Sequence, residues 1–420
     1  MSPPPVPSSR SPALPALIAT LLLGCGGVSP GPSAPAGAAR VEPVLVDVPE
    51  HRFDGRIPVA SIFPWIGRYA GSGIQSTLGA RMAVDELNLR GPVHGRSLAL
   101  LEYRTGSYFV DVRHASELAV GAGALAIVGS NSSGLSLEVA DRAEAAGIVQ
   151  VSNVSTAQDL TWDPGSGRER DFVFRVCGTD FEIGALLADF ARERLSARRV
   201  AVLYELGRTY SARMARVFAE SFQDPDAGRR AGEFPYIAQE TDFRPHLRRV
   251  LAFAPDALFV PGSFTDATLI AEQAERLGLR ATLLGADGWS NRLLFNRGGP
   301  PGDAYYGDLC AMPAEFRERY RRRFREAPDG CRALLAYDAV LALHAALQEL
   351  GPLEDADLRE GIARTRKRLR DALAAVDVPG AAGRLRFDRH GDIQRGIAVM
   401  RVSRSGAGVQ ARFDSWLGER

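Results

Sequence analysis

The chain has 420 residues, of which 45% are hydrophobic and 24% are charged, a composition typical of a globular protein long enough for two domains. Its formal net charge of +1 gives no reason to expect nucleic acid or an anionic membrane surface as a partner. The chain has a single lysine, Lys367, in a charged run that we interpret as a solvated helix face. Because a P-loop and a pyridoxal enzyme each need a functional lysine, both classes are excluded.

The N-terminal segment predicts export. An apolar run from Ala13 to Leu23 is too short to span a bilayer comfortably, so we interpret residues 1–24 as a signal peptide. The run ends in Leu-Leu-Gly-Cys, which resembles a bacterial lipobox, and Cys25 would then be the lipidated first residue of the mature protein. An ordinary cysteine in a secreted leader is the alternative interpretation. Residues 25–55, rich in proline, glycine and alanine at the start, are predicted to form a flexible tether. We therefore expect a periplasmic protein anchored to a bacterial membrane through Cys25.

Beyond the tether, strand-like and helix-like segments alternate along the chain. This alternation predicts an α/β fold with parallel sheets covered by helices on both faces. A single sheet of all these strands would be unusually large, so we expect two lobes. Residues 305–350 are predicted to be mostly helical, and 385–402 to contain short strands. The expected strands before that region are 57–63, 97–103, 124–129, 148–151, 172–176, 199–204, 257–260 and 281–286, and the expected helices are 73–89, 109–120, 135–146, 181–195, 211–222 and 267–277.

The stretch from Ala124 to Thr161 contains two apolar strands that each end in hydroxyl-bearing residues. The first strand is followed by Ser130-Asn-Ser132-Ser133, and the second by Ser152-Asn-Val-Ser155-Thr156. In parallel sheets, ligands bind at the carboxyl ends of the strands. Hydroxyls and unpaired N–H groups at a helix N-terminus favour a carboxylate. The sequence therefore predicts a polar binding edge in this stretch.

Patterns of other functional classes are missing or lie in the wrong context. A glycine-rich run at 121–126 precedes a strand, whereas a dinucleotide site needs those glycines between strand and helix. The six histidines show no paired metal-ligand spacing, and no Gly-x-Ser-x-Gly elbow accompanies Ser132 or Ser133. The basic run 317–325 has helical spacing and is typical of an amphipathic helix. We expect no catalytic residue, metal, cofactor or nucleic-acid partner.

From about Arg56 to Phe413, the chain resembles the type I periplasmic solute-binding proteins, in the leucine/isoleucine/valine-binding branch that serves ABC transporters. The order and spacing of many short motifs carry the resemblance. They are Gly79-Ala-Arg-Met-Ala-Val-Asp-Glu-Leu-Asn88, Ile127-Val-Gly129 with Ser132-Ser133, Val151-Ser152 with Ser155-Thr156, Val173-Phe-Arg175, Asp180, Tyr210, Thr241-Asp-Phe243, Gln273-Ala274 with Gly278-Leu279, Gly285-Ala-Asp-Gly288, Tyr337-Asp-Ala-Val340 and Gly391-Asp392.

The resemblance implies two Rossmann-like lobes that are joined by three hinge crossings and close on a ligand. Residues 56–177 with 308–382 would form the first lobe, and residues 178–307 with 383–420 the second. The family implies a monomer that captures an amino acid, branched-chain or related, and delivers it to the transmembrane subunits of an ABC permease without changing it. A sensor or protein-interaction lipoprotein of the same fold, acting on a receptor or a cell-wall synthase, remains an alternative because fold alone does not fix function. An enzyme with Rossmann-like lobes is the third class, and the missing glycine fingerprint and the presence of only one lysine count against it.

The resemblance also implies a set of ligand-binding residues. By position, Ser133 would hold the ligand α-carboxylate with its hydroxyl and backbone N–H, and Thr156 would assist with the carboxylate or the ammonium. Asp287, after a strand of the second lobe, would accept from the ammonium group. A zwitterion needs donors for one end and an anion for the other, so placing them on opposite lobes couples closure to the ligand. The neighbouring serines Ser132 and Ser155 belong to the same predicted set.

Aromatic residues are expected to form the walls of this site. Tyr210 and Phe264 match the family's aromatic positions, and Trp65 and Trp289 lie on nearby predicted loops. The chain departs from the branched-chain binders in three places. Phe264 replaces a tyrosine, Asp287 is shorter than their glutamate, and Asn131 is polar where they are apolar. These departures predict a side-chain pocket that differs from that of the branched-chain binders.

Each of these residues also has a purely structural interpretation. Ser133 and Thr156 could cap a helix or a turn, and Tyr210 and Phe264 could belong to the core. Asp180 is expected to fix a crossing between lobes or to cap the next helix. Apart from Cys25, the cysteines are Cys177, Cys310 and Cys331; we favour a disulfide between the last two, but the sequence does not settle the pairing.

Overall fold

The computed structural model describes residues 43, 45–47, 54–296, 300, 302–405 and 408–418. The predicted signal peptide and the predicted lipidation site Cys25 lie outside these described residues. Within the predicted tether, Leu45–Asp47 forms the short strand β1, which pairs antiparallel with the edge strand β3, Leu98–Thr105. The structure therefore differs from the prediction of a tether up to residue 55. The unpaired backbone groups of a sheet edge offer hydrogen bonds to a passing segment, which explains the pairing.

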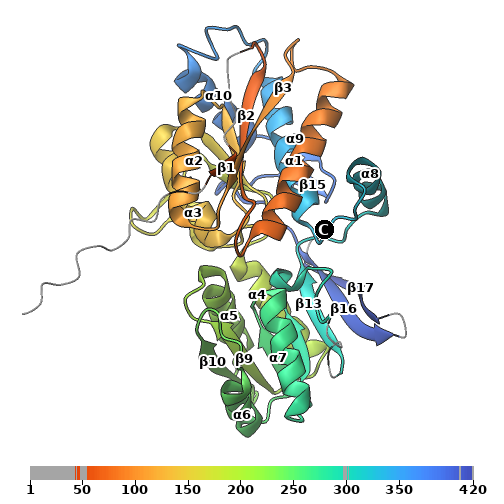
Figure 1. The fold of residues 1–420 in the computed structure, drawn as a ribbon. Coiled ribbons are helices and arrows are strands. Elements are labelled where there is room, and N and C mark those ends of the chain that lie inside the picture. Colours follow the sequence, from red (N-terminus) through yellow and green to blue (C-terminus); the bar gives the residue numbers. More distant parts are fainter. Residues whose placement is uncertain are drawn as a thin grey trace, which may run out of the picture. The chain divides into compact units, whose positions relative to one another are not determined.

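The first sheet has six strands in the order β1-β3-β2-β4-β5-β8, and every neighbouring pair after β1 is parallel. We call the body built on this sheet the first lobe (Figure 1). Its remaining strands are Ile57–Pro64 (β2), Ala126–Gly129 (β4), Val149–Ser152 (β5) and Val173–Arg175 (β8), and its helices are Ala70–Arg90 (α1), Phe109–Gly121 (α2), Ser133–Ala146 (α3), Arg332–Glu349 (α9) and Ile362–Ala374 (α10).

Alternate side chains of these strands pack on opposite faces of the first sheet. Val59 and Phe63 of β2 are buried in one cluster with residues of α1 and α9. Ala60 and Ile62 of the same strand are buried in another cluster with α2 and α3. A parallel strand buried on both faces reads as a continuous apolar run, which is why the sequence identified it. The predicted two-sided helical cover is confirmed for this lobe.

The second sheet has seven strands in the order β10-β9-β11-β12-β13-β16-β17. Its strands are parallel up to β13, and β16 and β17 add antiparallel. The body on this sheet is the second lobe. Its strands are Arg199–Glu205 (β9), Arg230–Tyr236 (β10), Ala257–Val260 (β11), Thr282–Gly285 (β12), Ala304–Asp308 (β13), Ile397–Ser405 (β16) and Gly408–Leu417 (β17), and its helices are Asp180–Glu193 (α4), Thr209–Phe222 (α5), Arg244–Phe253 (α6) and Phe264–Arg276 (α7).

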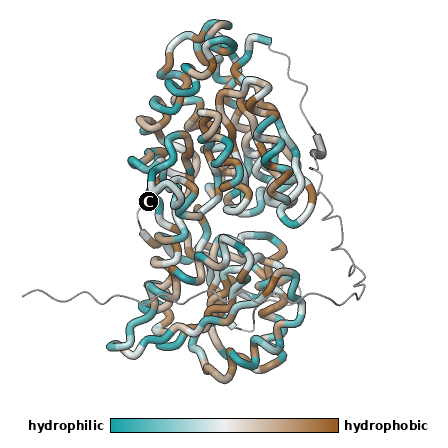
Figure 2. The backbone as a smooth tube through the Cα atoms, turned by 90° about the vertical axis from the view of Figure 1, so that its left-hand side faces the viewer, coloured by the Kyte–Doolittle hydropathy of each residue, from teal (hydrophilic) through white to brown (hydrophobic). Residues whose placement is uncertain are grey.

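Helices cover both faces of the second sheet as well. Val202 of β9 packs in a cluster with Phe218 of α5, whereas Leu203, the next residue, packs with Leu247 of α6 and Ile270 of α7. In Figure 2, hydrophobic (brown) stretches gather toward the interior, and hydrophilic (teal) residues mark many outer turns. This arrangement places the carboxyl ends of the parallel strands of each sheet along one edge, where ligand sites concentrate.

The chain passes between the lobes three times. It enters the second lobe between β8 and α4, and returns after β13 to α8, Ala314–Phe324. The third passage differs from the predicted boundary at residue 383, because Arg384–Arg386 (β15) pairs with Asp377–Pro379 (β14). The hairpin is held by Asp338 of α9, whose carboxylate accepts from the backbone N–H groups of Ala381 and Ala382. The passage to β16 therefore follows β15.

The region predicted to be mostly helical begins with a strand instead. Ala304–Asp308 forms β13, which lies between β12 and β16 and pairs with both. The rest of the region is mostly helical as predicted, in α8 and in α9, but its first residues form a strand because neighbouring strands, distant in sequence, supply the pairing. The two cysteines favoured for a disulfide, Cys310 and Cys331, are bonded, and the bond links the second passage to the start of α9. Cys177 is a free, fully buried cysteine, and burial raises the pKa of its thiol.

Candidate functional site

The N-terminus of α3 lies at the carboxyl end of β4, where the sequence predicts a carboxylate site. Ser132 is the residue before the first helical turn, and its side chain makes no capping hydrogen bond. Ser133 begins the helix and is buried, with 3% of its surface exposed. The alternative that a serine here caps the helix is therefore not what the structure shows. The first N–H groups of α3 donate to no capping side chain, so they suit an anionic group.

A buried network of serines holds the loop that precedes this helix. The hydroxyl oxygens of Ser136 and Ser155 are 2.5 Å apart, and the Ser136 hydroxyl also donates to the carbonyl oxygen of Ser130 at 2.8 Å. Ser155 donates to the same carbonyl at 3.4 Å and is fully buried. The structure thus places the predicted ligand residue Ser155 in a position that supports the loop. A hydroxyl at a strand end forms such bonds whenever the neighbouring loop lies within reach.

Thr156 lies at the first passage between the lobes. Its hydroxyl donates to Asp180 of α4, and the backbone N–H of Asp180 donates to the Thr156 carbonyl oxygen at 2.7 Å. Both residues are buried, and burial raises the pKa of Asp180 to about 7. The predicted ligand residue Thr156 therefore has a structural partner, and Asp180 connects the lobes as expected. The capping hydrogen bonds of α4 come from Thr179 and Glu182 instead.

Asp287 follows β12 and contacts Tyr210, another residue of the predicted site. The Tyr210 hydroxyl donates to Asp287 Oδ1 at 2.7 Å and accepts from the backbone N–H of Gly288 at 3.1 Å. Asp287 is 9% exposed, and burial raises its pKa while the Tyr210 hydroxyl opposes that shift. A cation beside this carboxylate would offset the cost of burying its charge. The structure brings these two predicted residues together.

The aromatic candidates are divided between the edge of the site and the core. Phe264, the first residue of α7, is half-buried and packs at the edge of the core of the second lobe. Trp65 follows β2; its indole N–H donates to Thr77, and the guanidinium of Arg104 lies 4.1 Å from its ring centre. Trp289 is 1% exposed and donates to the Val260 carbonyl oxygen. The suggestion that Trp289 lines the site is therefore corrected: it is a core residue.

Three arginines connect the two lobes around these residues. Arg68, between β2 and α1, donates to both carboxylate oxygens of Glu205 at the end of β9, with Nη1 2.8 Å from Oε1. Arg213 of α5 pairs with Asp159 of the first lobe. Arg332, at the start of α9, donates to the carbonyl oxygen of Ser290 in the second lobe at 2.7 Å. The two lobes are thus in contact over the predicted site.

Arg68, Glu205 and Arg208 were not among the predicted site residues. Glu205 is the last residue of β9, one residue beyond the predicted strand 199–204, and Arg208 immediately precedes α5. Both therefore satisfy the strand-end rule that selected Ser133 and Asp287. Charged residues in loops are also common on surfaces, and no second pattern in the sequence distinguishes these three from the others. The bidentate Arg68–Glu205 pair exists only because loops of both lobes meet.

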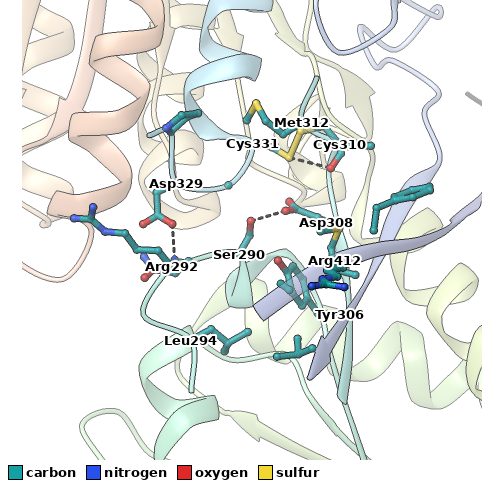
Figure 3. Close-up of a pocket in the computed structure, with 18 of the residues that line it drawn as sticks. Ser290, Arg292, Leu294, Tyr306, Asp308, Cys310, Met312, Asp329, Cys331 and Arg412 are labelled. Carbon is teal, nitrogen blue, oxygen red and sulfur yellow. Dashed lines mark hydrogen bonds between the residues drawn. A yellow bond between two sulfur atoms is a disulfide. The ribbon is translucent and has the colours of Figure 1, made fainter. Parts of the chain in front are cut away.

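A cavity of about 620 Å³ lies beside the site, at the second passage. Figure 3 shows Asp308 receiving a hydrogen bond from Ser290, with the Cys310–Cys331 disulfide close by. Burial raises the pKa of Asp308 to about 7. None of the predicted ligand-binding residues lines this cavity. Its walls come from the passage segments and from the β16–β17 ribbon, including Met400, Arg412 and Phe413.

No group of three or more His, Cys, Asp or Glu side chains in the described ranges is arranged to hold a metal ion. Of the helices that the structure describes, none combines the length and the apolar character needed to cross a membrane.

Comparisons with known proteins identify the family. A family model described as periplasmic binding protein matches residues 56–407 of this chain. The match covers most of the sequence, so the chain belongs to this family, in its leucine/isoleucine/valine-binding branch. Members are solute-binding proteins of transporters, and the chain is a binding protein rather than an enzyme.

Among the curated relatives, the chain is 27% identical over 351 residues to the Leu/Ile/Val-binding protein BraC3 of Rhizobium johnstonii, covering 80% of this chain and 89% of the relative. It is 24% identical to a leucine-, isoleucine-, valine-, threonine- and alanine-binding protein of Pseudomonas aeruginosa, covering 80% and 87%. Among solved structures, a leucine binding protein LivK of Thermotoga maritima superposes with a TM-score of 0.74 at 25% identity, covering 86% of this chain and 99% of that one. The two-lobed α/β fold expected from the sequence is confirmed.

Proposed function

We propose that this chain captures an amino acid between its two lobes and delivers it, chemically unchanged, to an ABC permease. The observation that carries the proposal is the meeting of two complementary half-sites. The N-terminus of α3 has no side-chain cap, and Asp287 of the other lobe is a buried carboxylate. A zwitterionic amino acid would satisfy both, with its carboxylate on the helix N-terminus and its ammonium on Asp287.

The proximity of the two half-sites supports this proposal. A Cβ atom built on Gly134, in the first turn of α3, would lie 3.8 Å from Thr209 Oγ1, at the start of α5. The residue after Thr209 is Tyr210, which donates to Asp287. A short path of neighbouring residues therefore joins Ser133 to Asp287 across the lobes. In this proposal Ser132 and Ser133 hold the carboxylate, and Thr156 and Ser155 position the loop beside them.

The relatives support an amino acid as the solute. Curated relatives are named as Leu/Ile/Val-binding proteins, and one solved relative, a LivJ protein of Streptococcus pneumoniae, was crystallised with isoleucine. Tyr210, Phe264 and Trp65 would contribute aromatic surface around the side chain of the ligand. We also propose that the protein is a periplasmic monomer, held at a bacterial membrane by lipidated Cys25. Loss of palmitate incorporation in Cys25→Ala would test that anchor.

A thermal-shift screen of the protein against amino acids tests the central proposal. Ligand that binds only the native state at 100 times its Kd stabilises by about 2.7 kcal/mol, so a true ligand stands clear of the others. Asp287→Asn should weaken that binding by roughly 30-fold or more, because removing one partner of a buried charge pair costs about 2–5 kcal/mol. Asp242→Asn is the matched control, since Asp242 is exposed near the start of α6 and pairs with Arg244.

Two results would count against the proposal. If no amino acid shifts the melting temperature, the ligand class is wrong; if Asp287→Asn binds as tightly as the wild type, the ammonium site is wrong. Tyr210→Phe provides a second variant should Asp287→Asn fold poorly, and it should weaken binding less. Copurification of permease subunits supports delivery, whereas copurification of a kinase or a cell-wall synthase supports the sensor alternative.

A further inference from the structure

Two polar side chains at the proposed site have buried atoms without partners. The Nε and Nη1 atoms of Arg208, immediately before α5, are shielded from solvent and find no hydrogen-bond acceptor among the described residues. Asn131, immediately before Ser132, is 8% exposed, and neither its amide nitrogen nor its amide oxygen has a partner there. Buried polar groups in native proteins are nearly always hydrogen-bonded, so unpartnered ones call for an explanation.

Both side chains belong to loops that border the proposed ligand. The guanidinium carbon of Arg208 lies 5.3 Å from the ring centre of Tyr210 and 5.8 Å from that of Tyr69 in the first lobe. Tyr210 is the residue that donates to Asp287. Asn131 comes from the opposite side, in the loop that leads into the N-terminus of α3. Arg208 and Asn131 thus approach the site from different lobes.

The carboxylates around Arg208 already have hydrogen-bond donors. The Glu205 carboxylate accepts hydrogen bonds from both Nη atoms of Arg68, and the Asp287 carboxylate accepts one from the Tyr210 hydroxyl. Asp266 receives the Tyr236 hydroxyl at 3.1 Å. Arg208 is therefore a cation beside the site whose buried N–H groups are not used by these neighbours. An anion that enters with the ligand would supply an acceptor at this guanidinium.

We propose that the ligand carries a second carboxylate at the end of its side chain, as aspartate and glutamate do, and that Arg208 and Asn131 bind it. The inference rests on the proposed function, in which α3 and Asp287 hold the backbone groups of the amino acid. A guanidinium donates two parallel hydrogen bonds to a carboxylate either from Nη1 and Nη2 or from Nε and Nη2, so the second carboxylate gives one of the two buried Arg208 nitrogens an acceptor. The Asn131 amide nitrogen adds a further donor. An aliphatic side chain would leave all of these buried groups unpaired.

The magnitude of the expected selectivity follows from that mismatch. A site built to hydrogen-bond a polar group discriminates against analogues that lack it by roughly 10⁴-fold, whereas a hydrophobic pocket separates similar side chains by only about 10- to 200-fold. We expect L-aspartate or L-glutamate to bind at least about 100-fold more tightly than L-leucine, a conservative bound set below the roughly 10⁴-fold that such a polar site reaches. L-glutamine, with a neutral amide, should fall between them.

Calorimetric titration of the full chain with L-aspartate, L-glutamate, L-glutamine and L-leucine tests the inference. Arg208→Gln should reduce the ratio of acidic to leucine affinity by at least about 30-fold, because it removes the charge that the side-chain carboxylate contacts. Arg216→Gln is the matched control: it makes the same charge change on α5, at a residue that is exposed and paired with Glu220, and should leave the ratio unchanged. Asn131→Ala is the second variant if Arg208→Gln does not fold, and it should lower the ratio in the same direction.

Three results would overturn this inference. Leucine binding as tightly as the acidic amino acids refutes it while the proposed function stands. An equal loss of acidic and leucine affinity in Arg208→Gln assigns Arg208 to the α-carboxylate and refutes it as well. If no amino acid of any class binds, the proposed function fails and the inference fails with it.

Discussion

The Arg68–Glu205 ion pair should stabilise the arrangement in which the lobes touch. Arg68 belongs to the first lobe and Glu205 to the second, so opening the lobes separates the pair. At an effective dielectric constant of about 20, unit charges about 4 Å apart attract by about 4 kcal/mol. Desolvation of Glu205, which is 2% exposed, and solvent around the 39%-exposed Arg68 side chain reduce the net value to about 1–2 kcal/mol.

Because the pair exists only in the closed arrangement, losing it weakens the free energy of ligand binding by the same amount as the pair contributes to closure. A loss of about 1–2 kcal/mol lowers the closed population, and hence the apparent affinity, roughly 5- to 30-fold. The assay is a double-mutant cycle on affinity, with Arg68→Met, Glu205→Gln and both together, titrated with the amino acid that gives the largest thermal shift. The coupling should shrink at high salt, because the Arg68 end of the pair is partly exposed to solvent.

The control cycle uses Arg81 and Glu102, which form a similar two-pronged pair within the first lobe. Their side chains are 32% and 15% exposed, so the electrostatics are comparable while opening leaves the pair intact. Their coupling measured on affinity should be close to zero. A coupling for Arg68 and Glu205 below about 0.5 kcal/mol, or one no larger than the control, would refute the idea that this pair holds the lobes together.

Two further predictions concern stability. Replacing both Cys310 and Cys331 by alanine should lower the free energy of unfolding by about 3 kcal/mol, because the disulfide closes a loop of sequence separation 21 and so reduces the conformational entropy of the unfolded chain. Urea denaturation measures this free energy. A change under about 1 kcal/mol would contradict the entropic explanation. Burial raises the pKa of Asp180 to about 7, above its unfolded value of about 3.9. The stabilising contribution of Asp180 to the folded state is therefore full at low pH and is lost as the pH rises between these two values. Asp180→Asn should therefore become progressively more stable than wild type from about pH 4 to about pH 7, and a difference that is constant over this range would contradict the shift.

Much of the fold could be predicted because its strands are buried on both faces. Such strands read as short apolar runs between helical patterns, and the expected strand at 257–260 matches β11. The pattern failed where pairing depends on distant partners. Ala304–Asp308 was expected to be part of a mostly helical region, but β12 and β16 make it a strand. The strand Arg230–Tyr236, whose alternation is interrupted by glycine and proline, was not expected at all.

The site could be predicted only in part, because strand ends are visible in the sequence and hydrogen-bond partners are not. The strand-end rule selected both Asp287 and Thr156, yet the first meets Tyr210 and the second meets Asp180 at a passage between lobes. The sequence shows that Asn131 is polar where branched-chain binders are apolar. Only the structure shows that its amide atoms are buried without partners.

In the proposed site, ligand binding and closure would use the same short segment of the second lobe. Asp287 begins a single 3₁₀ turn, and its side chain accepts from Tyr210. The carbonyl oxygens of Asp287 and Ser290 accept from Arg332 at 3.5 Å and 2.7 Å, and Arg332 begins α9 of the first lobe. A ligand ammonium on Asp287 would therefore stabilise a turn that the first lobe already holds in the closed arrangement. Because opening removes the Arg332 contacts and leaves the buried carboxylate without the cation, ligand and closure favour each other, as the linkage of binding to a conformational equilibrium requires.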